Sequence, residues 1–106
     1  MITAIFNYNK NRVISYEMTE HADSDELGKD LVCAGVSAVV FGLTNAIISL
    51  DESEPAITME DGGYLLVENI PDSEAAQTLI DGMIISLRTI EQSEDNLKFL
   101  TVIEDK

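Results

Sequence analysis

Residues 31–50 have the sequence LVCAGVSAVVFGLTNAIISL, in which no side chain carries a charge. We predict an α-helix over Leu31–Leu50, with Asp30 at its N-cap, because the larger apolar residues recur at helical spacing. These residues are Val32, Val36, Val39, Val40, Leu43, Ile47 and Leu50. The other side of the helix is also mostly small or apolar, so the helix needs cover on two sides. In a chain of 106 residues, we expect a second copy to supply part of that cover, in a homodimer.

The same stretch has the length of a membrane span, which needs about 20 apolar residues. Acidic residues flank it on both sides, however, and no loop rich in Lys or Arg sets an orientation. The N-terminus lacks the basic start of a signal peptide, and a single Cys excludes an internal disulfide. We therefore predict a buried helix in a cytoplasmic protein that has no membrane partner.

The rest of the chain predicts five strands and a second helix. The strands are expected over residues 2–9, 12–20, 55–60, 64–70 and 97–103, and the helix from Pro71–Glu74 to Ile90. Turn signals at Asn9–Asn11 and Asp61–Gly63 join two strand pairs into hairpins. The order β-β-α-β-β-α-β predicts a single α+β domain over residues 1–106, a two-layer sandwich of a mixed sheet and two helices.

The charge balance limits the partners of the chain. It has 6 basic and 20 acidic residues, which gives a net charge of −14. This charge repels phosphates and anionic membranes and attracts basic proteins, so no direct nucleic-acid binding is expected. One Cys and one His exclude the usual zinc clusters.

The two residues with nucleophilic and basic chemistry are Cys33 and His21. His21 closes the second predicted strand, and Cys33 follows twelve positions later in the first turn of the predicted helix. Unpaired N–H groups at a helix start favour a thiolate and can bind an oxyanion. A nearby His can take the thiol proton and later return it to a leaving amine. On spacing alone, a buried apolar Cys and a solvated His remain the alternative.

The segment Glu20-His21-Ala22, followed by Gly28-Lys29-Asp30-Leu31-Val32-Cys33-Ala34-Gly35-Val36-Ser37, resembles the ribosomal-processing cysteine protease (Prp, YsxB-like) family. That family has Gly-His-Ala at a strand end and Gly-x-Asp-x-Val-Cys-Ala-x-x-Ser at the start of a long helix. The matching positions are His21, Ala22, Gly28, Asp30, Val32, Cys33, Ala34 and Ser37. Glu20 stands where the family has Gly, and on an extended strand its side chain points away from His21.

The resemblance implies a cysteine endopeptidase with His21 and Cys33 as catalytic residues. The expected substrate is a basic large-subunit ribosomal protein, number twenty-seven, from which members remove a short N-terminal extension. The resemblance also implies a homodimer, as in the known members of the family, that needs no metal or cofactor.

Other residues near Cys33 receive supporting roles. Asp30 is predicted to cap the helix, with orientation of His21 as the alternative. Ser37 either hydrogen-bonds near Cys33 or bonds back to the helix backbone. We predict that His21–Lys29 is a mobile loop that closes over the substrate. Its substrate-binding residues are Ala22, Asp23, Asp25, Glu26, Leu27 and Gly28.

Two alternatives concern the tyrosines and the function. Tyr8, Tyr16 and Tyr64 are each assigned to the core, with a peptide groove as the alternative. The alternative function is a non-catalytic, acidic, homodimeric module that binds a basic ribosomal protein segment. Loss of Cys33 would leave such a module working, whereas it would inactivate a protease.

Overall fold

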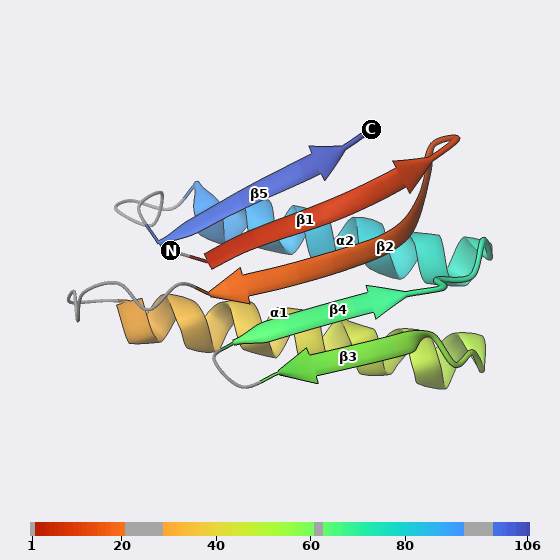
Figure 1. The fold of residues 1–106 in the computed structure, drawn as a ribbon, viewed down its shortest axis with the longest axis horizontal. Coiled ribbons are helices and arrows are strands. Elements are labelled where there is room, and N and C mark those ends of the chain that lie inside the picture. Colours follow the sequence, from red (N-terminus) through yellow and green to blue (C-terminus); the bar gives the residue numbers. More distant parts are fainter. Residues whose placement is uncertain (1, 21–28, 61–62, 93–98) are drawn as a thin grey trace.

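The computed structural model describes residues 2–20, 29–60, 63–92 and 99–106, which form one sheet and two helices (Figure 1). The elements in chain order are β1 (Ile2–Asn9), β2 (Arg12–Glu20), α1 (Lys29–Asp51), β3 (Ala56–Glu60), β4 (Tyr64–Glu68), α2 (Glu74–Glu91) and β5 (Leu100–Asp105). This order confirms the predicted β-β-α-β-β-α-β arrangement and the α+β class.

The sheet is mixed, with strand order β3-β4-β2-β1-β5. The strand β1 is antiparallel to β2 and parallel to β5, which joins from the other end of the chain. Lys10 and Asn11 have φ values of 52° and 67°, the left-handed conformation of a two-residue hairpin turn that matches the twist of its strands. The local hairpin therefore forms the centre of the sheet.

Both helices lie on one face of the sheet and pack side by side (Figure 1). The core between the two layers includes Phe6, Tyr16, Val36, Val40, Ile47, Ile80, Met83, Leu87 and Leu100. The sheet and α2 thus cover two sides of α1, which accounts for much of its apolar circumference. Ala34 and Ala38 stay exposed on its outer side.

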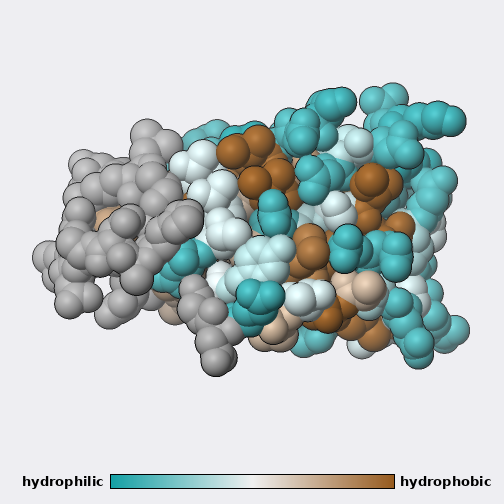
Figure 2. Space-filling view, viewed as in Figure 1, coloured by the Kyte–Doolittle hydropathy of each residue, from teal (hydrophilic) through white to brown (hydrophobic). Residues whose placement is uncertain are grey.

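Figure 2 shows the opposite face of the sheet, where hydrophilic side chains surround small apolar patches. Ile5 and Ile103 are paired in register on β1 and β5, and Ile103 is 42% exposed. Alternation along each strand explains this face, because the residues on either side of a buried position point away from the helices.

The helix α1 differs from the prediction at both ends. It begins at Lys29, so Lys29 belongs to the helix rather than to the loop, and Asp30 lies inside the first turn rather than at the N-cap. Leu50 is 70% exposed and was wrongly assigned to the buried side. The inward positions continue from Thr44 and Ile47, and the helical period places the next one at Asp51.

Boundaries of other elements also differ. The strand β4 ends at Glu68 rather than residue 70, because Asn69 has a φ of 57° and leaves the strand conformation. The helix α2 begins at Glu74, after Ser73 caps it by accepting a hydrogen bond from the Ala76 N–H. The last strand begins at Leu100 and continues to Asp105 rather than ending at residue 103, since pairing with β1 continues to Asn7.

By length and hydropathy alone, Leu31–Asp51 of α1 could also span a membrane. Val32, Val36, Val40 and Ile47 are buried in the core of the fold, and the hydroxyl groups of Thr44 and Tyr16 lie 2.6 Å apart. We therefore interpret α1 as the core helix of this domain.

A polar network joins α2 to the edge of the sheet. The Tyr8 hydroxyl donates to Glu104 at 2.6 Å, and Arg88 donates to the other Glu104 oxygen at 3.2 Å. The hydrogen bond from Tyr8, followed by that from Arg88, lowers the pKa of Glu104 below its ordinary value. Desolvation and the bond to Glu104 raise the pKa of Tyr8.

This network predicts an acid-sensitive contribution to stability. Because the pKa of Glu104 is lower in the folded protein, its contribution is complete above the unfolded pKa and is lost as pH falls through the folded pKa. Glu104→Gln should lower the free energy of unfolding by about 1 kcal/mol at neutral pH. Urea denaturation should show this difference shrinking between about pH 5 and pH 3. The exposed neighbour Asp105 supplies the control Asp105→Asn, and an equal effect of both variants would contradict the prediction.

Candidate active site

Cys33 lies near the N-terminal end of α1, on the side of the helix that faces the end of β2. It is the fifth residue of the helix, so it lies one turn in from the unpaired N–H groups at the helix start. The thiol is partly exposed and packs against the edge of the core. Because the field of a helix terminus falls off within the first turn, contacts from other elements have more influence on this thiol than the sequence suggested.

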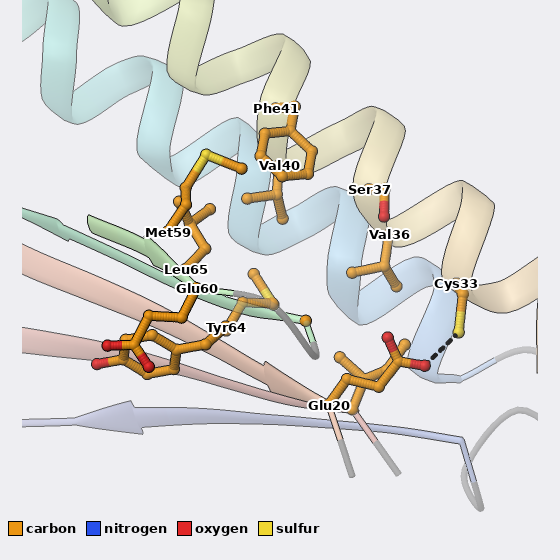
Figure 3. A pocket seen from close by; sticks show the side chains of 13 residues that line it. Glu20, Cys33, Val36, Ser37, Val40, Phe41, Met59, Glu60, Tyr64 and Leu65 are labelled. Atoms are coloured by element: carbon orange, nitrogen blue, oxygen red, sulfur yellow. Dashed lines mark hydrogen bonds between the residues drawn. The ribbon is translucent and has the colours of Figure 1, made fainter. Parts of the chain in front are cut away.

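The last residue of β2 contacts the Cys33 thiol. The Cys33 thiol donates a hydrogen bond to Oε1 of Glu20 over an Sγ–O distance of 3.2 Å. Figure 3 shows the two side chains pointing toward each other across the gap between helix and sheet. Glu20 is two residues after Met18, which is buried, so strand alternation directs both side chains toward the helices.

A pocket of about 260 Å³ opens beside Cys33, between α1 and the β3–β4 hairpin (Figure 3). Its lining residues are Ile2, Met18, Glu20, Cys33, Val36, Ser37, Val40, Phe41, Met59, Glu60, Gly63, Tyr64 and Leu65. Phe41 is 41% and Met59 61% exposed, so the wall is apolar but open to solvent. The volume is near the lower end of the range of about 300–1,000 Å³ for ligand sites, which suits one or two side chains of a peptide.

Two carboxylates and a phenol supply the polar groups of the pocket along with Cys33 and Ser37. Glu20 lies beside the thiol, whereas Glu60 lies on β3. The Tyr64 hydroxyl donates to Glu17 at 3.2 Å. Desolvation, and then the bond to Glu17, raise the pKa of Tyr64, so Tyr64 stays protonated at neutral pH. Among the described residues that line the pocket, none is basic.

Gly63 sets the approach of β4 to Glu20. Its φ is +88°, and an added Cβ would lie 2.8 Å from the Cβ of Glu20 and 3.0 Å from Oε2. Only glycine avoids both the steric clash and the backbone strain at this position. The Glu20 side chain is therefore confined between the start of β4 and the start of α1.

The predicted site residues divide into two groups. Cys33 and Ser37 lie one turn apart on α1 and both line the pocket. His21 and the predicted loop residues Ala22, Asp23, Asp25, Glu26, Leu27 and Gly28 lie outside the described residues, as does the side chain of Asp30. The dyad and the closing loop therefore stay predictions.

The tyrosines and the pocket walls add to the sequence analysis. Tyr16 is a core residue as predicted, whereas Tyr64 lines the pocket. Glu20, Phe41 and Met59 were not predicted as site residues. One indication for Phe41 was present in the sequence, because it lies on the side of the predicted helix opposite the core residues. That Phe41 and Met59 line the same pocket follows only from the fold.

The described residues contain no group of three His, Cys, Asp or Glu side chains that could hold a metal ion. A partly exposed thiol beside an apolar pocket is compatible with an enzyme that uses cysteine as a nucleophile. The site therefore fits the class of cysteine-dependent enzymes.

Comparison with known proteins agrees with this class. The family model described as "Cysteine protease Prp" matches residues 1–97. The chain is 52% identical to the ribosomal processing cysteine protease Prp of Bacillus subtilis (strain 168), covering 86% of this chain and 88% of the relative. It is 41% identical to the protein of the same name from Staphylococcus aureus (strain Mu50), covering 87% and 90%. The chain therefore belongs to the Prp family of cysteine proteases.

Solved structures show the same fold. The crystal structure of an essential ribosomal processing protease Prp from S. aureus in complex with a substrate peptide is 36% identical, with a TM-score of 0.88. The same S. aureus protease with a covalently linked product peptide is 37% identical, with a TM-score of 0.85. Each comparison covers 99% of this chain and 100% of the other.

The Gly63 contact predicts a position that tolerates no side chain. Gly63→Ala should lower the free energy of unfolding by about 1–2 kcal/mol, because it forces φ strain and displaces Glu20. Gly42→Ala is the control, since a Cβ there meets no atom within 4 Å. This helical substitution should raise stability by about 0.5–1 kcal/mol. Thermal unfolding of both variants tests the prediction, and equal stability of Gly63→Ala and the parent would contradict it.

Proposed function

We propose that this cysteine protease removes an N-terminal extension from a large-subunit ribosomal protein, number twenty-seven, with Cys33 as nucleophile and His21 as general base. The carrying observation is the position of the Cys33 thiol, partly exposed at the edge of an apolar pocket. The names of the relatives support ribosomal processing as the role. The complexes of the S. aureus protein with a substrate peptide and with a covalently linked product peptide support a peptide as the substrate.

The proposed chemistry uses His21 to accept and return a proton in each of its two steps, formation of a thioester and its hydrolysis. His21, which directly follows the residue in contact with Cys33, takes the proton from the Cys33 thiol. The sulfur attacks the scissile carbonyl carbon and forms a thioester as the C–N bond breaks, and His21 returns the proton to the leaving amine. Water, deprotonated by the same imidazole, then hydrolyses the thioester and restores the thiol.

The pocket and the charge of the chain support a peptide of particular composition. Val36, Val40, Phe41 and Met59 provide an apolar wall for a large side chain next to the scissile bond. The net charge of −14 attracts a basic ribosomal protein and speeds its encounter at low salt. The family assignment disfavours the alternative of a non-catalytic binding module, because the matched relatives are named as proteases.

We further propose a cytoplasmic homodimer. Cytoplasmic location follows from the ribosomal substrate and from a single Cys, which forms no internal disulfide. The outer side of α1 supports the dimer, because Ala34 and Ala38 are exposed there and Leu31 is 78% exposed. Small exposed residues let a second helix approach closely.

Removal of either dyad residue should abolish or strongly reduce cleavage. Cys33→Ala should fold and bind an extended substrate but give no product by mass spectrometry. His21→Ala should lower the rate by about 10²–10⁴-fold and slow the alkylation of Cys33 at neutral pH. Ser49→Ala, exposed near the far end of α1, is the control and should cleave at the parent rate. Normal cleavage by Cys33→Ala would end the protease mechanism, and unchanged alkylation in His21→Ala would end the base role.

The homodimer is tested by mass in solution. Light scattering at micromolar concentration should give twice the chain mass of 11.6 kDa. Ala38→Glu places a charge on the exposed side of α1 and should shift the distribution to monomer without changing the helix content. A parent protein that is monomeric at this concentration would contradict the proposal.

A further inference from the structure

Glu20 accepts a hydrogen bond from the Cys33 thiol, and the proposed reaction does not use this contact. We propose that Glu20 is a positioning residue that holds Cys33 as the protonated thiol in the free enzyme. The proposal rests on the proposed function in one respect, since Cys33 is taken as the nucleophile. It adds a restraint on when that nucleophile becomes reactive.

The hydrogen bond has a direction that decides which form of Cys33 is favoured. The thiol is the donor and the Glu20 carboxylate is the acceptor, at 3.2 Å. A carboxylate accepts a proton donor but repels a second negative charge, so the contact stabilises the thiol and opposes the thiolate. The helix start acts in the other direction, but Cys33 lies one turn away from it. The group in direct contact therefore outweighs the more distant helix terminus.

The position of Glu20 is built into the fold. Strand alternation along β2 turns its side chain toward α1, as it does for Met18. Gly63, the turn residue just before β4, lies against it, and an added Cβ there would lie 2.8 Å from the Cβ of Glu20. The Glu20 side chain thus lies between Gly63 and α1, with its carboxylate at the thiol.

The other titratable groups that face Cys33 in the described part of the pocket act in the same direction or are neutral. Glu60 adds a second carboxylate from β3, and Tyr64 is a protonated phenol whose own proton is directed to Glu17. Among the described residues that line the pocket, the charged ones are these two carboxylates. The bond to Glu20 holds the thiol proton, so loss of that proton to the base costs this hydrogen bond.

The hydrogen bond from the thiol to Glu20 makes the reactivity of Cys33 depend on whether a peptide is bound. In the free enzyme the thiol is held by Glu20 and reacts slowly with electrophiles. A peptide that enters the pocket competes for the space and the hydrogen bonds around Glu20, which frees the thiol at the moment when a scissile carbonyl is present.

The test is the pH dependence of Cys33 alkylation by iodoacetamide in the full-length protein. The chain has a single Cys, so mass spectrometry reports this thiol alone. Glu20→Gln keeps a hydrogen-bond acceptor but removes the charge, and Glu20→Ala removes both. In each variant the midpoint of the rate–pH curve should move to lower pH, with alkylation at neutral pH about tenfold faster.

Glu60→Gln is the matched control, because it changes the net charge equally and removes a carboxylate from the same pocket without removing the contact with Cys33. Its midpoint should move less than that of Glu20→Gln. Thermal unfolding verifies that each variant is folded, and the near-isosteric Glu20→Gln keeps the test valid if Glu20→Ala does not fold.

Three results would overturn the proposal: an unchanged midpoint in Glu20→Gln, an equal shift in Glu60→Gln, or slower alkylation. Slower alkylation would show that Glu20 assists ionisation. None of these results depends on cleavage of a ribosomal protein, so they are distinct from a failure of the dyad, which Cys33→Ala reports.

Discussion

The packing of α1 across the sheet is the constraint on which the site depends. Val32, Val36, Val40 and Ile47 bury one side of the helix, and burial of each such side chain contributes roughly 1.5–3 kcal/mol. This contact fixes the rotation of the helix about its axis. In this orientation of the helix, Cys33 lies on the side that faces the end of β2. Ser37 and Phe41, further along the helix, line the same pocket. One side of α1 therefore contributes residues to the core, and an adjacent side contributes residues to the site.

The sequence was sufficient for features that depend on local periodicity. Alternation in β1 and β2, the apolar repeat of α1 and the glycines before Tyr64 predicted the elements and their order. The position of Cys33 near a helix start followed in the same way. The predicted ends of the elements were less accurate. The start of α1 at Lys29 and the end of β4 before Asn69 are set by backbone conformation, which hydropathy does not report.

Features that depend on long-range contact could not be read from spacing. In the sequence, Glu20 stands out only as a departure from the family's Gly. The structure adds that its carboxylate accepts a hydrogen bond from Cys33. Thirteen positions separate the two residues, and only the packing of α1 on the sheet shows that they meet. Likewise, Met59 is an ordinary strand residue in the sequence and becomes a pocket wall because β3 extends beyond the cover of α1.

The strand order also has a consequence for the timing of folding. The strand β1 pairs with β2 through a tight turn, but its other neighbour is β5, the last element of the chain. Ile2, which lines the pocket, donates its backbone N–H to the carbonyl of Phe99 at 2.8 Å. Contacts this distant in sequence form late, because the loop-closure entropy must be overcome first. The β1–β2 hairpin, which already aligns Ile2 with Glu20, is therefore expected to form before β5 completes the sheet beside β1.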